Sequence, residues 1–173
     1  MKNLKNLILI LLLVLYSCSS ENISYEISNA GLKVNATVHG IFIPKDSLII
    51  ESIKVIDFNS DYSYKPYFRL WGISQPEIKT KNIKIDKYNE GWFLLNNDEI
   101  ALVFLSQHSK AVYIRTKLKP PSQVRLISKI EPTDSSGIRE NFSVLLGSDK
   151  PDELKKLLEA KWLNDNENRI ITL

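Results

Sequence analysis

The apolar and polar positions along the chain follow three different patterns. An unbroken apolar run covers Leu7 to Leu15, short segments of alternating apolar and polar residues follow from Tyr25 to Leu146, and residues 151–162 repeat apolar side chains at helical spacing. A period of two predicts β-strands, whereas recurrence every three or four residues predicts an amphipathic helix. The pattern therefore predicts a mainly β fold with one C-terminal α-helix.

The alternating segments predict an antiparallel meander. "YEIS" and "LKVNATV" flank the turn residues Asn29 to Gly31 and predict a first hairpin. Further strands are expected at "SLIIESIKVIDF", "YKPYFRLWGIS" and "NIKIDKY". Only polar turns separate "GWFLL", "EIALVFL" and "AVYIRTK", so these three are expected to pair in sequence. "SQVRLISKI" is predicted to be a strand too, either in an elongated hairpin with residues 142–146 or in an inserted flap.

The predicted helix carries clear start signals. Ser148 or Asp149 can cap it, Pro151 suits the first turn, and two acidic residues follow near the positive end of the helix dipole. One face holds Leu154, Leu157, Leu158 and Trp162. A helix with one apolar face is expected to cover the open end of a strongly bent sheet. The polar tail, residues 164–173, is expected to form a turn and a short last strand.

The first 17 residues have the layout of a secretory signal. Lys2 and Lys5 precede the apolar run, and no acidic residue occurs before Glu21. The run is shorter than the roughly 20 residues that span a bilayer, so the pattern favours export over a permanent span.

Leu15, Tyr16, Ser17 and Cys18 resemble the lipobox of bacterial lipoproteins. The resemblance implies that the thiol of Cys18 receives a diacylglycerol and that cleavage makes Cys18 the first residue. Two or more acyl chains anchor a protein stably, whereas one binds only marginally. An uncleaved anchor, or a secreted chain in which Cys18 is discarded or free, is the alternative. Ser19 after Cys18 favours the outer membrane where the bacterium has one.

These signals divide the chain into four parts: a lipoprotein signal peptide at 1–17, a lipidated tether at 18–24, a β domain at 25–163 and a tail at 164–173. Without Lys2 and Lys5, 21 basic residues face 20 acidic ones. Such a balance gives no field that would attract nucleic acid. Cys18 is the single cysteine of the chain, so no internal disulfide supports the domain.

Two segments, "GWFLLNNDEIALVFLSQHSKAVYIRTK" and "FSVLLGSDKPDELKKLL", resemble the bacterial pleckstrin-homology (PH-like) domain families. Gly91, Phe93, Asp149 and Pro151 are the distinctive positions. The resemblance implies a PH-like barrel of two near-orthogonal antiparallel sheets capped by the helix, with an insertion at about 118–141. Phosphoinositide binding is not carried over, because the first strand loop near Asn29 holds no basic residue.

No motif predicts a catalytic residue, a cofactor site or a metal site. His39 and His108 both fall in predicted turns without a motif around them. Asp57, Asn59 and Asp61 alternate like calcium ligands but lack the glycine and glutamate of a calcium loop. The adjacent acids Asp98–Glu99 and Asp152–Glu153 have local explanations, in a turn and at a helix start.

The candidate partner surface is the segment "YSYKPYFRLW", with Tyr64, Tyr67, Arg69 and Trp71. Aromatic residues with arginine are enriched at binding hot spots, although a core strand with a decorated edge is the favoured explanation of the segment. Lysines between residues 79 and 87 are a second candidate, for contact with anionic lipid headgroups; a lysine-protected edge strand explains them as well.

The sequence thus predicts an exported bacterial lipoprotein, anchored to the cell membrane or outer membrane through Cys18. Its β domain is expected to be a noncatalytic module of the cell envelope that binds a protein or peptide, with strand addition at an exposed sheet edge as one mode. The alternative is a carrier or sensor that holds a small apolar ligand between sheet and helix.

Overall fold

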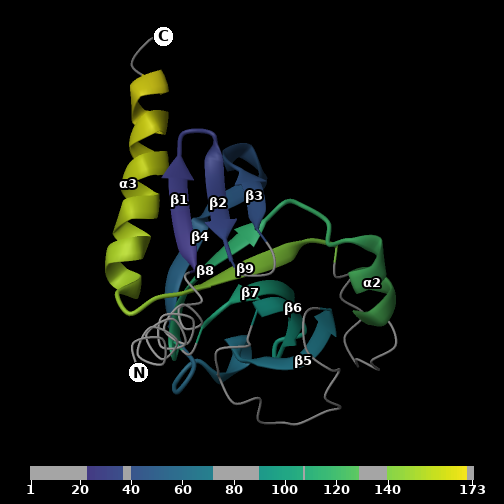
Figure 1. Ribbon diagram of the computed structural model, residues 1–173. Coiled ribbons are helices and arrows are strands. Elements are labelled where there is room, and N and C mark those ends of the chain that lie inside the picture. Colours follow the sequence, from purple (N-terminus) through teal and green to yellow (C-terminus); the bar gives the residue numbers. More distant parts are fainter. Residues whose placement is uncertain (1–22, 37–39, 72–89, 107, 129–139, 171–173) are drawn as a thin grey trace, which may run out of the picture.

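The computed structural model describes residues 23–36, 40–71, 90–106, 108–128 and 140–170 (Figure 1). Two β-sheets and a long C-terminal helix make up most of this part of the chain. The predicted mainly β fold with a C-terminal helix is therefore confirmed. None of the helices in the described ranges is long and apolar enough to cross a membrane.

The smaller sheet contains the first predicted hairpin. Its strands β1 (Ser24–Ser28), β2 (Gly31–Asn35) and β3 (Ile41–Pro44) lie in that order and are antiparallel. The hairpin closes where Ser28 pairs with Gly31, whose φ of +152° suits glycine. A Cβ at Gly31 would lie 2.1 Å from the carbonyl oxygen of Ile43, so any larger residue would push β3 away from β2.

The larger sheet has six strands in the order β4-β8-β9-β7-β6-β5. Their bounds are β4 (Leu48–Asp57), β5 (Pro66–Trp71), β6 (Glu90–Leu95), β7 (Ile100–Phe104), β8 (Lys110–Thr116) and β9 (Phe142–Gly147). The short turns η1 (Lys45–Ser47) and η2 (Tyr62–Tyr64) and the helices α2 (Ser122–Ser128) and α3 (Pro151–Ile170) complete the described elements.

The central position of β9 corrects the predicted meander. β6 and β7 form the expected antiparallel pair, but β9 separates β7 from β8, parallel to the first and antiparallel to the second. All six residues of β9 are buried. A strand that is apolar on both faces gains most when it has a neighbour on each side, which places it inside the sheet and not at its edge.

Two other predicted elements differ from the structure. "SQVRLIS" forms the helix α2 and not a strand, and its first bond runs from the Arg125 amide to the Pro121 carbonyl at 3.0 Å. Buried Val124 between exposed neighbours fits both periods at this length. Helix α3 continues to Ile170, where a turn and a strand were expected. The predicted strand "NIKIDKY" lies outside the described residues.

Apolar side chains fill both faces of the larger sheet. The first core lies between the two sheets and α3; among its members are Leu32, Val34, Ile43, Leu102, Phe104, Val144, Leu146, Leu158 and Trp162. The second core covers the opposite face and contains Ile56, Phe58, Phe93, Leu95, Ala101, Val103, Leu105, Ala111, Tyr113 and Leu145. Alternate residues of β7 and β9 enter different cores, so both central strands are buried on both sides.

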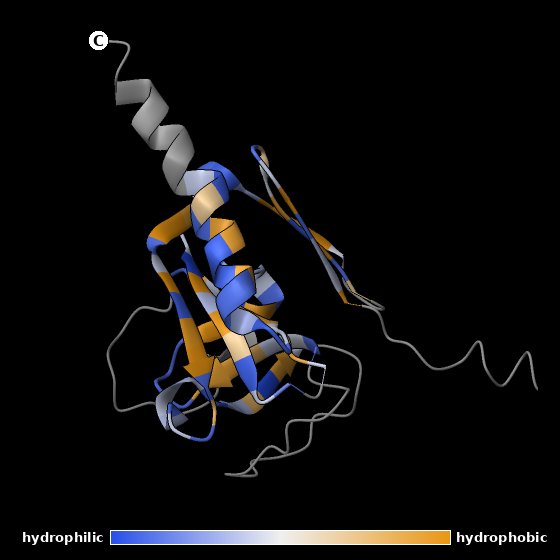
Figure 2. Cartoon of the chain, turned by 90° about the vertical axis from the view of Figure 1, so that its left-hand side faces the viewer, coloured by the Kyte–Doolittle hydropathy of each residue, from blue (hydrophilic) through white to orange (hydrophobic). Residues whose placement is uncertain are grey.

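Helix α3 lies along one side of both sheets and connects them. It packs against β4 and β8 of the larger sheet and against β1 of the smaller one (Figures 1 and 2). The indole Nε1–H of buried Trp162 donates to the Ser28 carbonyl at 3.0 Å. The first intrahelical bond, from the Leu154 amide to the Lys150 carbonyl at 3.1 Å, makes Lys150 the N-cap in place of the predicted Ser148 or Asp149. Ser148 Oγ accepts from the Lys150 amide at 3.0 Å and shapes the turn ahead of the helix. The sheets are bridged by α3 and do not close into a barrel.

We expect Trp162→Ala to lower the free energy of unfolding by about 3 to 5 kcal/mol, because it empties a fully buried site and removes the bond to Ser28. Leu157→Ala is the matched control on the same helix, since Leu157 is 61% exposed; its effect should stay within about 0.5 kcal/mol. Urea denaturation followed by tryptophan fluorescence and circular dichroism measures both. Equal losses would contradict the helix packing described.

Candidate functional site

The structure divides the predicted partner surface between the two faces of the larger sheet. Tyr64 and Arg69 lie on the second core, where the Tyr64 ring is 5.0 Å from that of Tyr113 and the Arg69 guanidinium is 4.8 Å from the ring of Phe93. Tyr67 packs on the first core. Two of the three aromatic side chains, Tyr64 and Tyr67, therefore support the cores, as expected for a core strand with a decorated edge.

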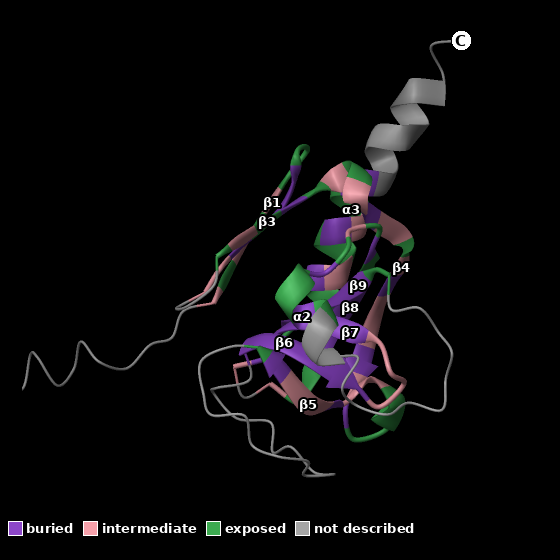
Figure 3. Cartoon of the chain, turned by 90° about the vertical axis from the view of Figure 1, so that its right-hand side faces the viewer, coloured by how far each residue is buried: buried purple, intermediate pink, exposed green. Residues whose placement is uncertain are grey.

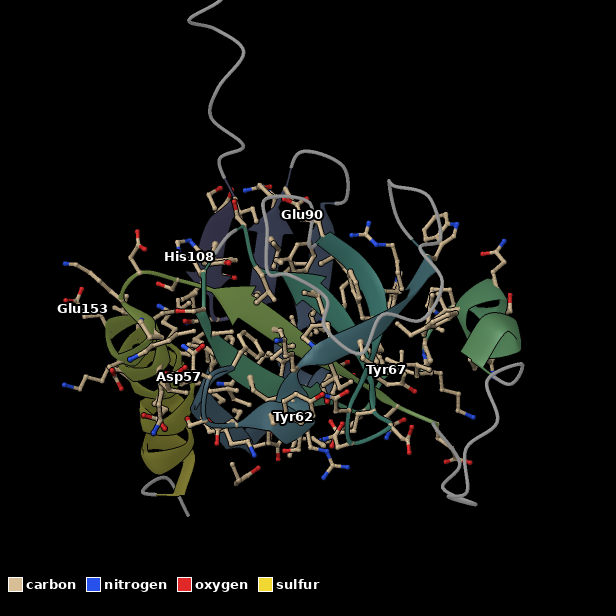
Figure 4. All side chains as sticks on the ribbon, turned by 90° about the horizontal axis from the view of Figure 1, so that it is seen from below. Asp57, Tyr62, Tyr67, Glu90, His108 and Glu153 are labelled. Atoms are coloured by element: carbon tan, nitrogen blue, oxygen red, sulfur yellow. The ribbon has the colours of Figure 1, made fainter. Side chains whose placement is uncertain are left out.

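Only part of the segment is left for a partner. Trp71 is 51% exposed at the end of β5, and neighbouring Tyr62 is 54% exposed. The Tyr67 hydroxyl donates to Asp98 Oδ1 at 3.5 Å and lies toward α2 in Figure 4. Tyr62 and Trp71 are thus the side chains of this segment that present apolar surface to solvent.

A hydrogen-bonded network, which the sequence interpretation did not anticipate, joins the partly buried Glu99 to two buried hydroxyl groups on β8 and β9. Glu99 Oε2 accepts hydrogen bonds from the Tyr113 hydroxyl at 2.6 Å and from Ser143 Oγ at 2.8 Å. The two hydroxyl oxygens lie 3.1 Å apart. Glu99 comes directly before β7, Tyr113 is on β8 and Ser143 is on β9. The only available signal was Ser143, the single polar side chain in the otherwise apolar strand β9.

Lys54 extends this network at the surface. Its ammonium group donates to the Tyr64 hydroxyl and lies 3.9 Å from the centre of the Tyr64 ring and 5.0 Å from that of Tyr113. A cation over an aromatic face is attracted by the ring's quadrupole. Lys54 thereby covers both tyrosines from the β4 side.

The network keeps the Tyr113 hydroxyl protonated and buries the Ser143 hydroxyl, so neither group is prepared to act as a nucleophile. Burial, and then the hydrogen bond to Glu99, raise the pKa of Tyr113 well above its ordinary range, so its hydroxyl stays a donor. Ser143 is only 3% exposed, which leaves no approach for a substrate to its oxygen. The network therefore fixes β9 between its neighbours and satisfies the buried hydroxyl groups of Tyr113 and Ser143.

The predicted turn histidine, His108, makes a structural contact. Its Nδ1 lies 3.1 Å from Asp149 Oδ1, which joins the turn before β8 to the segment before α3. Figure 4 shows His108 and Asp57 on the α3 side of the molecule. His39 lies outside the described residues, as do Cys18 and the lysines between 79 and 87.

The calcium-like motif of Asp57, Asn59 and Asp61 forms a hydrogen-bonded turn. Asp57 Oδ1 accepts from the Asn59 amide at 2.9 Å, and Asp61 Oδ2 accepts from the Asp57 amide at 3.0 Å. The bond from Asn59 and the nearby charge of Lys110 lower the pKa of Asp57. Over the part of the chain that the structure describes, no three His, Cys, Asp or Glu side chains form a group that could hold a metal ion.

No protein-family model, curated protein or solved structure matches this chain. The geometry of its own residues therefore carries the functional argument. Within the described residues, that geometry offers exposed aromatic side chains, a sheet edge at β3 that pairs only with β2, and polar groups that serve the fold.

Tyr113→Phe should lower the free energy of unfolding by about 1.5 to 3 kcal/mol, because it removes a hydrogen bond to a charged acceptor and leaves Glu99 less satisfied. Tyr62→Phe, at an exposed ring, is the control and should change little. Urea midpoints of the two variants and the unaltered chain give the comparison. If Tyr113→Phe is as stable as the control, the network does not stabilise β9.

The two buried tyrosines also predict a pH dependence. Burial raises the pKa of Tyr25 and of Tyr113, whereas an unfolded tyrosine titrates near about 10. The folded chain then binds more protons above that pH, so its stability must fall as the pH rises through about 10. Urea titrations between about pH 8 and about pH 11 should show a steeper loss for the unaltered chain than for the double variant Tyr25→Phe, Tyr113→Phe. Parallel curves would contradict the assignment.

Proposed function

We propose that this chain is an exported lipoprotein, anchored to a bacterial membrane through Cys18, whose β domain is a noncatalytic module that binds a protein or peptide in the cell envelope. The lipobox at residues 15–18 supports the anchor. The observation that carries the module is the edge strand β3, which pairs only with β2 among the described strands, together with the exposed rings of Phe42, Tyr62 and Trp71. Exposed sheet edges accept an added strand from a partner.

The chemistry of the described residues supports a binding role over an enzymatic one. Ser143 and Tyr113 are buried and serve a strand junction, and His108 pairs with an acid in a turn. An activated nucleophile needs a base beside it and access for the substrate. The residues best placed to act on a partner are therefore apolar and aromatic groups at the surface.

The packing between sheets and helix also favours the interaction module over the apolar carrier. Trp162, Leu158 and Phe104 occupy this space and are fully buried. Small β structures either enclose one ligand or are filled by their own side chains. The first core is filled by its own side chains.

The finer proposal, a distant PH-like domain, is supported by the two sheets and by a C-terminal helix along their open side. Pro151 and the acidic first turn stand at the helix start as in the family pattern. The parallel β7–β9 pair departs from the antiparallel arrangement that the likeness implies.

The anchor is tested in a bacterial host that processes lipoproteins. The full chain should sediment with membranes, resist high salt and alkaline carbonate, and leave only with detergent, because acyl chains hold it. Mass spectrometry should find an amino terminus at Cys18 that carries a diacylglyceryl group. Cys18→Ser should abolish the modification, and Ser20→Ala, two residues away, should not. An unmodified Cys18 in the membrane-bound chain would overturn the anchor.

A further inference from the structure

The smaller sheet has one packed face and one open face. Leu32, Val34 and Ile43 point inward and are fully buried in the first core. Side chains alternate between the two faces of a strand, so the residues next to these point outward. The open face carries the side chains of Ser24, Glu26, Ser28, Lys33, Asn35 and Phe42. Figure 3 shows the smaller sheet as an outer layer of the molecule.

The chemistry of the open face suits the surface of a bilayer. Phe42 is 50% exposed and is the aromatic side chain of this face. Its cross-strand neighbour Lys33 pairs with Glu26 at 3.0 Å, and Asn35 Nδ2 donates to the same carboxylate at 2.7 Å. The face therefore presents one ring among neutral or paired polar groups. Protein surfaces that lie on membranes place aromatic rings at the boundary between headgroups and acyl chains.

The place of the open face in the chain brings it close to the anchor. β1 begins at Ser24, six residues after Cys18. Six residues span at most about 20 to 22 Å, whatever path they take. A lipid on Cys18 thus holds the start of the open face within this distance of the headgroups. The larger sheet packs behind the smaller one and leaves the open face unobstructed.

We infer that the open face lies flat on the membrane that anchors the chain, with the Phe42 ring among the lipid headgroups. The inference rests on the proposed anchor at Cys18, since one ring is too small a surface to hold the domain on a bilayer without it. Anchoring raises the effective concentration of the face at the membrane, so a weak contact is sufficient. The open face is then a second contact with lipid, and it orients the domain.

The place of Phe42 within the face favours a flat arrangement over a sheet that stands on end. Ser24 and Ser28 are four residues apart on β1, which is about 13 Å along a strand. Phe42 lies between these two levels, on the line that joins Glu26 to Lys33. If the sheet stood on end, the ring would remain in water. If the sheet lies flat, the ring leaves water, which is the favourable outcome for an apolar group.

This orientation leaves the exposed ring of Tyr62 for a partner. Tyr62 belongs to η2, whose Tyr64 packs on the second core, on the opposite face of the larger sheet. Figure 4 shows Tyr62 on the side of the molecule away from the smaller sheet. Packed sheets lie about 10 Å apart, so Tyr62 is at least one layer farther from the lipid. The outer edge of β3, which pairs only with β2 among the described strands, borders the open face and is not used by this contact.

Quenching of a fluorescent probe by lipid tests the orientation, with the full lipidated chain in liposomes. With Cys18 acylated, Ser28→Cys gives one free thiol at the end of the open face that lies farther from the anchor. Ser60→Cys, in the turn after β4, is the matched control, because both serines are exposed and each donates from Oγ to a carbonyl at 3.3 Å. Since packed sheets lie about 10 Å apart, nitroxides on the headgroups should quench a bimane probe about three times as strongly at Ser28→Cys as at Ser60→Cys.

Phe42→Ser, combined with Ser28→Cys, measures the contribution of the ring. It should lower the quenching toward the value at Ser60→Cys, whereas Tyr62→Ser, at a ring of similar exposure, should leave it unchanged. Equal quenching at the two cysteine sites, or quenching at Ser28→Cys that does not depend on Phe42, would overturn the inference. Mass analysis of Cys18 in the same liposomes separates the two proposals. A lipidated chain with equal quenching overturns the orientation alone, whereas a chain without the lipid overturns the anchor and the orientation together.

Discussion

The position of β9 between β7 and β8 is the constraint on which the rest of the structure depends. Its six residues are all buried, so the larger sheet must be covered on both faces at its centre. The smaller sheet and α3 cover one face, while Phe58 and Tyr64 contribute to the other. The need to cover two apolar faces thus fixes where the smaller sheet, α3 and the segment before β5 can lie.

Local rules were sufficient for the first hairpin and for the start of α3. The hairpin needed a turn that glycine can make beside two alternating segments, and Gly31 has that place. The helix needed a proline and acidic residues in its first turn and an apolar stripe, of which Leu154, Leu158 and Trp162 are buried and Leu157 is exposed. Such features depend on neighbours within a few residues, which sequence reasoning can see.

Features built from distant residues escaped prediction. In the sequence, a short polar turn between β7 and β8 looks the same whether the two strands pair directly or a third strand lies between them. The one sequence feature that indicated a central strand was the nearly continuous apolar run "FSVLLG". The network of Glu99, Tyr113 and Ser143 spans three elements, and no local spacing announces it. The segment around Tyr67 was chosen for composition, which does not distinguish a ring in a core from one at the surface.

The direction of β1 has a mechanical consequence. The strand runs from Ser24 to Ser28 and returns through Gly31 into β2, and five residue pairs join the two strands. Because Ser24 pairs with Asn35 at the open end of this hairpin, a force on the chain ahead of Ser24 acts first on that pair. The Tyr25 hydroxyl, which donates to the Gly147 carbonyl at 2.8 Å, adds a cross-link to the larger sheet near the point of load. Opening the hairpin from this end therefore breaks the Tyr25 cross-link before the pairs nearer the turn.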